Sequence, residues 1–379
     1  MIIQLSVERN TRGPQTAQEI CRLFALEWLF SLTPFDSQHR PSVYLVDMYH
    51  KFLTVVTLLF ACVTDSFAQD AKKPISVIQA ISTPDFGYLP SLIARSTGYF
   101  AQEGLDFKLL VISVRVSVPA LLSRQVQFAP AGSSMPAALQ GAPLKAIFFS
   151  YRTSTFQLIV RPEITSPQAL KGKAIGISSP GSSNDQASRL MMRKLGLEPN
   201  RDATLLSTGD SQARILALET GTVAGSLVNP DVAAHMALRG YRILTNSAEV
   251  YPVPFSGMAV HDELIKENPD LIKRWLRAHI RAMVSIRKNP EEAAQLAAKE
   301  LKLSNDVALG ATKLLLPLIN ADDPGGFTEK SMRLNLEYSA SRQGGDASKV
   351  PISQVADVTL LREAQRELGI NCKDGYQCK

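Results

Sequence analysis

Four short segments of this 379-residue chain hold polar and aromatic side chains that could bind a small molecule. The first, residues 82–90, places Asp85 beside Phe86 and Tyr88. A carboxylate accepts hydrogen bonds and aromatic rings offer flat apolar faces, so these side chains could hold an organic solute. A turn whose two rings cover the hydrophobic core would explain the same residues.

The second segment, residues 130–136, is rich in small residues and precedes a predicted helix. Gly132 and Ser133 would let a ligand approach backbone amides. Ser134 could instead cap the helix, and Pro136 suits its first turn. The segment therefore predicts either a ligand-binding loop or an ordinary helix start.

The third segment, residues 178–186, leads from a strand into a helix N-terminus, where free N–H groups attract anions. Ser183 and Gln186 match a capping box, which alone would explain the serine. Asp185 in the first turn already supplies a negative charge and so argues against a strongly anionic ligand. The candidate ligand contacts here are Ser182, Ser183 and Asn184.

The fourth segment, residues 228–231, is the counterpart of the second in the other half of the chain. Asn229 could exchange hydrogen bonds with a ligand, with a helix-cap role as the alternative. Phe255 completes the set of candidate ligand contacts.

The elements around these segments alternate short β-branched runs with helical stretches, which is typical of a parallel sheet covered by helices. Ligands of such folds bind beyond the carboxyl ends of the strands. The first predicted set is 75–81, 90–96, 107–112, 118–124 and 126–129. The second is 174–177, 185–195, 204–207, 212–220, 223–227, 232–239 and 242–245.

Residues 122–141 and 218–240 share one order of helix end, buried strand, polar loop and helix. We therefore predict an α/β fold of two lobes, each a mostly parallel sheet flanked by helices. Lobe 1 is expected to comprise residues 69–152 and 255–370, and lobe 2 residues 153–254, with 371–379 as a C-terminal tail.

The chain should cross between the lobes near residues 149–153 and 251–255, where loop residues can absorb the rotation of a closing cleft. The candidate hinge residues are Ser150, Tyr151, Arg152, Pro252 and Pro254. Later in the chain, proline-led amphipathic stretches after Asn268 and Asn289 predict a helical C-terminal segment. Further helices are expected at 328–343 and 357–368.

Composition is that of an ordinary globular protein, with 45% hydrophobic and 20% charged residues. The formal net charge of +6 is a mild bias toward anions. The sequence has no arginine-rich run and no basic stripe interleaved with aromatic residues, so it does not indicate nucleic-acid binding.

Residues 48–68 have the pattern of a secretory signal peptide: a basic start, a 12-residue apolar run, and small residues before a cut after Ala68. The run is too short to span a membrane. Residues 1–47 are then interpreted as misannotated upstream sequence; the alternative is a cytoplasmic leader followed by an anchor. A lipoprotein cut before Cys62 is another alternative, although Phe60 is bulky for it. We expect a periplasmic protein.

Cleavage after Ala68 would leave two cysteines, Cys372 and Cys378, in a polar tail. Six residues apart, they could form a disulfide across a turn in an oxidising compartment, or remain free thiols. Two cysteines are too few ligands to predict zinc. Neither a metal nor a cofactor is expected.

With these segments assembled, the chain resembles the nitrate, sulfonate, taurine and thiamine-precursor group of periplasmic binding proteins. The most specific element is Gly-Tyr-Phe-x-x-Glu-Gly-Leu at residues 98–105. The resemblance covers about residues 73–369. Further matches lie at 86–90, 94–97, 120–123, 128–132, 170–176, 268–269 and 289–294.

The resemblance implies a type II periplasmic-binding fold that clamps a solute between two lobes and delivers it to the permease of an ABC importer. It implies a monomer that catalyses no reaction. The ligand contacts that it implies are Phe86, Tyr88, Ser133, Ser134, Ser182, Ser183 and Asn229.

Two features depart from the family pattern. Gln127 stands where an acidic residue is usual, and neither 130–136 nor 178–186 contains an arginine. A sulfonate is recognised best by a bidentate guanidinium, so strong anion binding would need Arg152 to turn inward.

Two other classes of function stay open. A relative with this fold is an enzyme that makes a thiamine precursor with a cysteine cluster, a histidine and pyridoxal phosphate. Here the histidines His235, His261 and His279 fall on helical stretches, where His261 is expected to cap a helix and His279 to lie on a helix surface. A sensory or adaptor protein is the other alternative.

Overall fold

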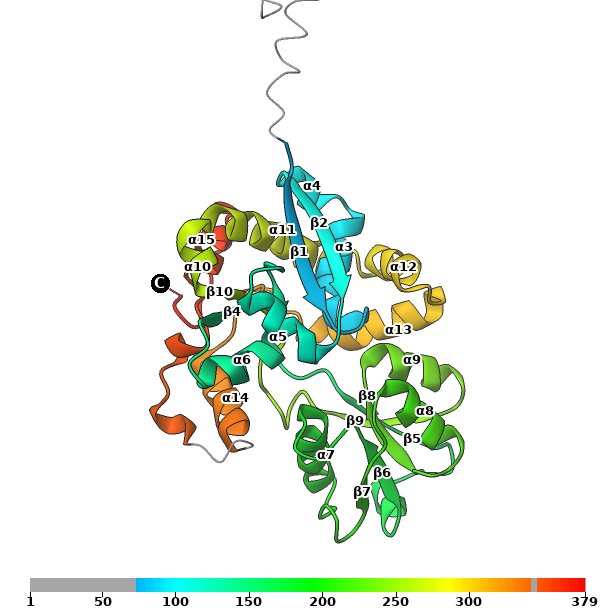
Figure 1. Ribbon diagram of the computed structural model, residues 1–379. Coiled ribbons are helices and arrows are strands. Elements are labelled where there is room, and N and C mark those ends of the chain that lie inside the picture. The colour runs from blue at the N-terminus through cyan, green and yellow to red at the C-terminus, as the bar shows by residue number, and fades with distance from the viewer. Residues whose placement is uncertain (1–72, 342–345, 379) are drawn as a thin grey trace, which may run out of the picture. The chain divides into compact units, whose positions relative to one another are not determined.

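The computed structural model describes residues 73–341 and 346–378 (Figure 1). The predicted upstream sequence 1–47, the signal peptide 48–68 and Cys62 lie outside the described residues. Residues from Pro74 onward belong to one compact unit. Its described strands form three sheets. Two of the sheets belong to what is here called lobe 1 and the third to lobe 2, and each lobe has its own buried apolar residues.

Lobe 1 begins with two parallel strands, β1 and β2, joined by helices α3 and α4. Gly98 stands between the two helices with a φ of 74°, a left-handed conformation that glycine adopts without strain. The second sheet of lobe 1 has the strand order β3-β10-β4, with β10 antiparallel to both neighbours. The bounds are β1 Ile75–Ile81, α3 Leu89–Ser96, α4 Tyr99–Gln102, β2 Leu105–Val111, α5 Val114–Leu122, β3 Ala129–Pro130, α6 Ala131–Leu139, β4 Leu144–Tyr151 and β10 Phe255–His261.

Lobe 2 is a five-stranded sheet with the order β7-β6-β8-β5-β9. Strand β6 is parallel to β7 and β8, whereas β5 is antiparallel to β8 and β9. The bounds are β5 Gln157–Val160, β6 Ala174–Ile177, α7 Ser183–Lys194, β7 Thr204–Ser207, α8 Ser211–Glu219, β8 Gly225–Val228, α9 Pro230–Leu238 and β9 Arg242–Asn246.

The fold is α/β as predicted, but its sheets are mixed rather than mostly parallel. The reason lies in the four strands that flank the two lobe crossings. The chain leaves lobe 1 through β4 and enters lobe 2 as β5, then leaves through β9 and returns as β10. Each incoming strand pairs with the outgoing strand of the same lobe, which runs in the opposite direction.

In the C-terminal segment, α11 packs against α3 and α4 of lobe 1, whereas α13 packs against α9 of lobe 2. Asn268 caps α11 by accepting from the Leu271 N–H, and Pro269 occupies its first position. The ring of Trp275 is fully buried and stacks on Phe128 with a centroid distance of 4.3 Å. The bounds are α10 Asp262–Glu267, α11 Pro269–Lys288, α12 Pro290–Leu301, α13 Asn305–Leu315, α14 Glu329–Ser341 and α15 Thr359–Glu367.

The expected cap at His261 is confirmed, because its Nδ1 accepts from the Glu263 N–H. The expectation for His279 is wrong: this residue is buried in the core of lobe 1. At the C-terminus, Cys372 and Cys378 form a disulfide with their Cα atoms 5.6 Å apart.

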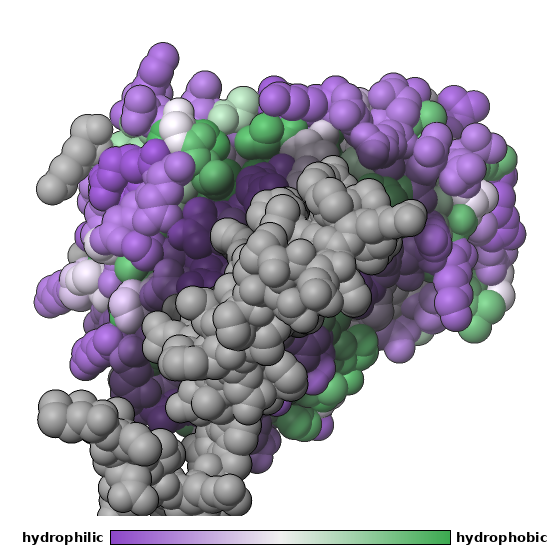
Figure 2. Space-filling view, turned by 90° about the horizontal axis from the view of Figure 1, so that it is seen from above, coloured by the Kyte–Doolittle hydropathy of each residue, from purple (hydrophilic) through white to green (hydrophobic). Residues whose placement is uncertain are grey.

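Figure 2 shows one face of the molecule, which is mostly hydrophilic with scattered apolar residues. Such scattering is normal for a protein surface. Within residues 73–341 and 346–378, no helix is both long and apolar enough to cross a membrane.

Candidate functional site

A cavity of about 390 Å³ is lined by residues of both lobes and of the two crossing segments. Its size suits a small organic molecule. The polar side chains on its wall are Ser82, Asp85, Tyr88, Ser133, Ser183, Asn229, Thr155, Tyr251, Ser256, Asn335 and Ser339. Its aromatic side chains are Tyr88, Phe149, Phe156, Tyr251 and Phe255.

The structure brings six of the predicted ligand contacts to this wall, from elements that the sequence places far apart. The 3-10 turn Phe86–Tyr88 begins at Asp85, which accepts from the Gly87 N–H at 2.8 Å. The six residues on the wall are Asp85, Tyr88, Ser133, Ser183, Asn229 and Phe255.

Two other predicted contacts are buried away from the cavity in lobe 1. Phe86 has no exposed surface and belongs to the hydrophobic core, as the alternative interpretation of its turn suggested. Ser134 is buried because helix α6 begins at Ala131, directly after β3, so the expected loop is already helical. Its hydroxyl donates to the Pro130 carbonyl at 3.0 Å, and Pro136 lies inside the helix.

The remaining two predicted contacts serve the backbone of lobe 2. The predicted capping box is displaced by one residue: Ser182, not Ser183, is the N-cap of α7 and accepts from the Asp185 N–H. Asn184 is buried, accepts from the Ser178 N–H and donates to the Leu227 carbonyl. Because Ser182 performs the capping, the neighbouring Ser183 is left to line the cavity.

Sequence reasoning missed several residues of the wall. Thr155 and Phe156 lie in the first crossing segment, and Asn335 and Ser339 lie one turn apart on α14. Ser256 on β10 has a φ of 52°, which is uncommon for a residue other than glycine. Strained backbone of this kind concentrates at functional sites, but the sequence carries no sign of it.

The predicted hinge residues lie at the two crossings. Ser150 and Tyr151 end β4, where the Ser150 hydroxyl donates to the Ser256 carbonyl and the Tyr151 hydroxyl to the Phe86 carbonyl. Arg152 and Pro252 are exposed, and Pro254 lines the cavity. The crossings are tied by a hydrogen bond of 2.7 Å between the hydroxyls of Ser154 and Ser247.

Asp85 dominates the electrostatics of the cavity. Loss of hydration in the protein interior and, second, the nearby charge of Asp231 together raise the pKa of Asp85 to about 7, against the opposing hydrogen bonds from Gly87 and Asn229. Burial also raises the pKa of the Asp231 carboxyl, as well as the pKa values of the Tyr88 and Tyr151 hydroxyls. Burial thus shifts the titration of each of these groups toward its neutral form.

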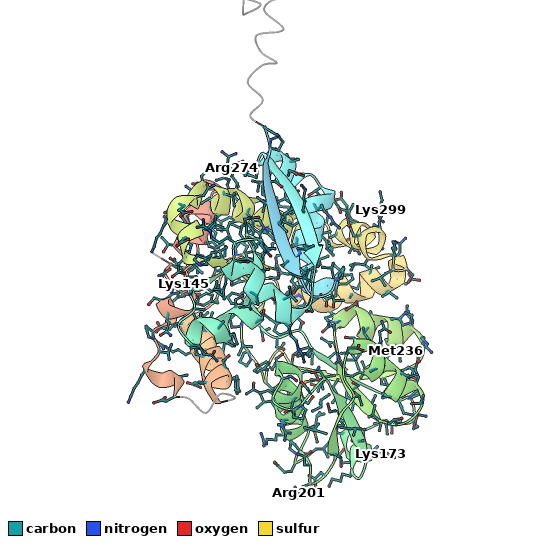
Figure 3. All side chains as sticks on the ribbon, in the orientation of Figure 1. Lys145, Lys173, Arg201, Met236, Arg274 and Lys299 are labelled. Atoms are coloured by element: carbon teal, nitrogen blue, oxygen red, sulfur yellow. A yellow bond between two sulfur atoms is a disulfide. The ribbon has the colours of Figure 1, made fainter. Side chains whose placement is uncertain are left out.

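Among the residues that the structure describes, no lysine, arginine or histidine lines the cavity. In Figure 3 the labelled bases Arg274, Lys299, Lys173 and Arg201 lie at the outer edges of the molecule. Among residues 73–341 and 346–378, no group of three or more histidine, cysteine, aspartate or glutamate side chains could hold a metal ion. The wall therefore offers hydroxyls, amides, aromatic faces and one carboxylate.

Asn229 joins the two lobes across the cavity, because its Nδ2 donates to Oδ2 of Asp85 at 3.1 Å. We expect Asn229→Ala and Tyr88→Ala each to weaken ligand binding about tenfold, by loss of a polar contact and of an aromatic face, respectively. Isothermal titration calorimetry would measure the affinity. Tyr88→Phe keeps the ring and is the matched control; unchanged affinity in both alanine variants would contradict the site.

The model of the NMT1/THI5-like family matches residues 85–293. The chain is 26% identical over 271 residues to the riboflavin-binding protein RibY of Chloroflexus aurantiacus, covering 68% of this chain and 74% of that protein. It is also 26% identical over 334 residues to a putative aliphatic sulfonates-binding protein of Bacillus subtilis, covering 83% and 96%.

Solved structures with the same fold include the periplasmic aliphatic sulphonate binding protein SsuA from Escherichia coli. Its TM-score is 0.59 at 16% identity, over 75% of this chain and 92% of that chain. The desulfurization enzyme DszB also shares the fold, with a TM-score of 0.57 at 15% identity over 78% and 99%. One fold thus serves binding proteins and an enzyme, so function must be argued from the site.

Proposed function

The chain belongs to the NMT1/THI5-like family, and from this premise we propose that it is the extracytoplasmic solute-binding component of an ABC importer. One observation carries the proposal: a single cavity draws its wall from both lobes and both crossings. A solute in such a cavity contacts both lobes at once, which favours the closed state over the open one. The relatives named as solute-binding proteins support the same role.

The composition of the wall supports a polar organic solute of modest size, held by hydroxyls, amides and aromatic rings. Phe156 and Phe255 meet edge to face at 5.1 Å and could border a flat group. The described part of the wall has no guanidinium of the kind that a sulfonate or nitrate would favour, and Arg152 is exposed outside it. We therefore place a ring-bearing or nitrogenous solute ahead of a sulfonate.

Binding without chemical conversion is the simplest role for this wall. Among the described lining residues, no histidine stands beside the serine and threonine hydroxyls to act as a general base. The proposed partner is the permease of an importer. A sensory role would use the same cavity and differ only in the partner.

A variant that fills the cavity tests the proposal directly. Gly132 lines the cavity, and a Cβ added there would have no heavy atom within 4 Å. We expect Gly132→Leu to fold normally and to weaken binding of every solute at least about tenfold, because the new side chain occupies the ligand's space.

The measurement is thermal unfolding with a panel of sulfonates, nitrate, amino acids, aminopyrimidines and flavins, since a ligand of the folded state raises the midpoint. Ala237→Leu adds leucine at an exposed site of α9 and is the control. A solute that stabilises the original protein and Gly132→Leu equally would contradict the proposed site. Conversion of the solute during incubation would indicate an enzyme.

A further inference from the structure

Among the described residues that line the cavity, Asp85 carries the only formally charged side chain. Its Oδ1 accepts from the Gly87 N–H at 2.8 Å, and its Oδ2 accepts from Asn229 Nδ2 at 3.1 Å. Both donors are uncharged amides. Each oxygen can accept more than one hydrogen bond, so the carboxylate keeps capacity for a ligand.

A second carboxylate, Asp231, strengthens the negative potential behind Asn229. It stands two residues further along, in the first turn of α9. Its Oδ1 is buried and has no hydrogen-bond partner among the described residues. Asp231 acts electrostatically on Asp85, so the two acidic groups oppose each other's ionisation.

Protein interiors normally compensate a buried negative charge with a cation or a dense set of donors. The buried acids Asp323 and Asp185 follow that rule: Asp323 pairs with Arg362, and Asp185 with Arg189 at 2.9 Å. Among the described residues, the ion pairs include none that involves Asp85 or Asp231. Asp85, whose charge has no paired cation among the described residues, lines the cavity that a solute would fill.

We propose that the bound solute presents a protonated or N–H-rich nitrogen group to Asp85, and that this residue selects such solutes over oxyanions. The inference rests on the proposed function and names the ligand class of the same cavity. An amidinium or ammonium group would donate to Asp85 and supply the missing positive charge. A sulfonate or carboxylate would meet a like charge there without a base to offset it.

Three probes that share a benzene ring test the proposal: benzamidine as the cation, benzamide as the neutral donor and benzenesulfonate as the anion. Affinities are measured by calorimetry at pH 8, with each probe raised to 20 mM. We expect benzamidine to bind at least about tenfold more tightly than benzenesulfonate. Asp85→Asn, which removes the charge and keeps the shape, should erase that preference.

The pH dependence of binding provides a second measurement, made on the protein without substitutions. Because Asp85 titrates near pH 7, affinity for benzamidine should fall at least about tenfold between pH 8 and pH 5.5, as the carboxylate gains its proton. Affinity for benzamide should change less. In Asp85→Asn, the dependence for benzamidine should disappear.

Three outcomes would overturn the inference: no binding of benzamidine at 20 mM, a preference for benzenesulfonate, or an unchanged preference in Asp85→Asn. The Gly132→Leu variant separates this failure from that of the proposed function. If a sulfonate binds and Gly132→Leu abolishes its binding, solute capture stands and only the ligand class is wrong. If Gly132→Leu leaves every bound solute unaffected, the proposed binding site fails as well.

Discussion

Arg362→Met is expected to lower the free energy of unfolding by about 3–5 kcal/mol, because it leaves a buried carboxylate without its cation. The side chains of Arg362 and Asp323 form an ion pair and are each only 4% exposed. Gln365 Nε2 also donates to Asp323 Oδ1 at 2.9 Å, and Arg362 Nη2 donates to the Tyr376 carbonyl at 2.7 Å. Removing the guanidinium therefore breaks a connected network.

Urea unfolding at pH 7 measures the effect. The double variant Arg362→Met, Asp323→Leu removes both charges and should recover most of the lost stability, since no uncompensated ion remains. Arg366→Met, at an exposed position of the same helix α15, should change stability by less than about 0.5 kcal/mol. A loss below about 1 kcal/mol in Arg362→Met would show that the pair is not coupled to folding.

The same network connects the C-terminal tail to the cavity wall. Tyr376, inside the loop closed by the Cys372–Cys378 disulfide, stacks on Phe327 with centroids 5.4 Å apart. Phe327 in turn meets the edge of Phe149, which lines the cavity, at 5.6 Å. The disulfide and the ion pair thus hold the tail where it supports one aromatic side of the site.

Helices and strands whose ends are set by nearby residues could be predicted from the sequence. The strands Ile75–Ile81, Ala174–Ile177 and Thr204–Ser207 have the predicted bounds, and helix α11 begins at its expected proline. The crossing strands β4 and β5 were not predicted as strands. Each is defined by antiparallel pairing with strands more than 60 residues away, β4 with β10 and β5 with β8 and β9, which no local pattern records.

In the candidate site, too, some residues could be predicted from local sequence and others could not. The position of loops after strands was enough to bring Asp85, Tyr88 and Asn229 to the wall. Ser183 lines the cavity because the N-cap of α7 is Ser182, one residue earlier than predicted. Sequence patterns do not locate a helix end to within one residue. Asn335 lines the cavity because helix α14 packs beside it in the folded protein, and no local sequence pattern indicates this packing.

His279 was expected on a helix surface, and its burial gives the protein a specific sensitivity to acid. The ring has Trp275 at 3.6 Å and Phe148 at 5.1 Å, centroid to centroid. Its Nδ1 lies 2.9 Å from the Trp275 carbonyl, which can only accept, so Nδ1 carries the proton. Nε2 then accepts from the Ser91 hydroxyl at 2.8 Å, which in turn accepts from Gln79.

This network fits a neutral imidazole. Loss of hydration lowers the pKa of His279 to about 3, outweighing the opposing hydrogen bond to the Trp275 carbonyl. Between pH 6.5, the ordinary value of histidine, and about 3, the unfolded chain binds a proton that the folded chain does not. Stability must therefore fall as pH falls through this window.

We expect the original protein to lose about 2–3 kcal/mol more stability than His279→Gln between pH 7 and pH 4.5, because the variant has no imidazole to protonate. Urea unfolding at both pH values measures the difference, with His235→Gln, at an exposed site of α9, as the control. Equal pH dependence in the original protein and His279→Gln would contradict a buried neutral imidazole. The network also borders the site, because Gln79 lies on β1, the strand that leads directly into the loop carrying Ser82 and Asp85.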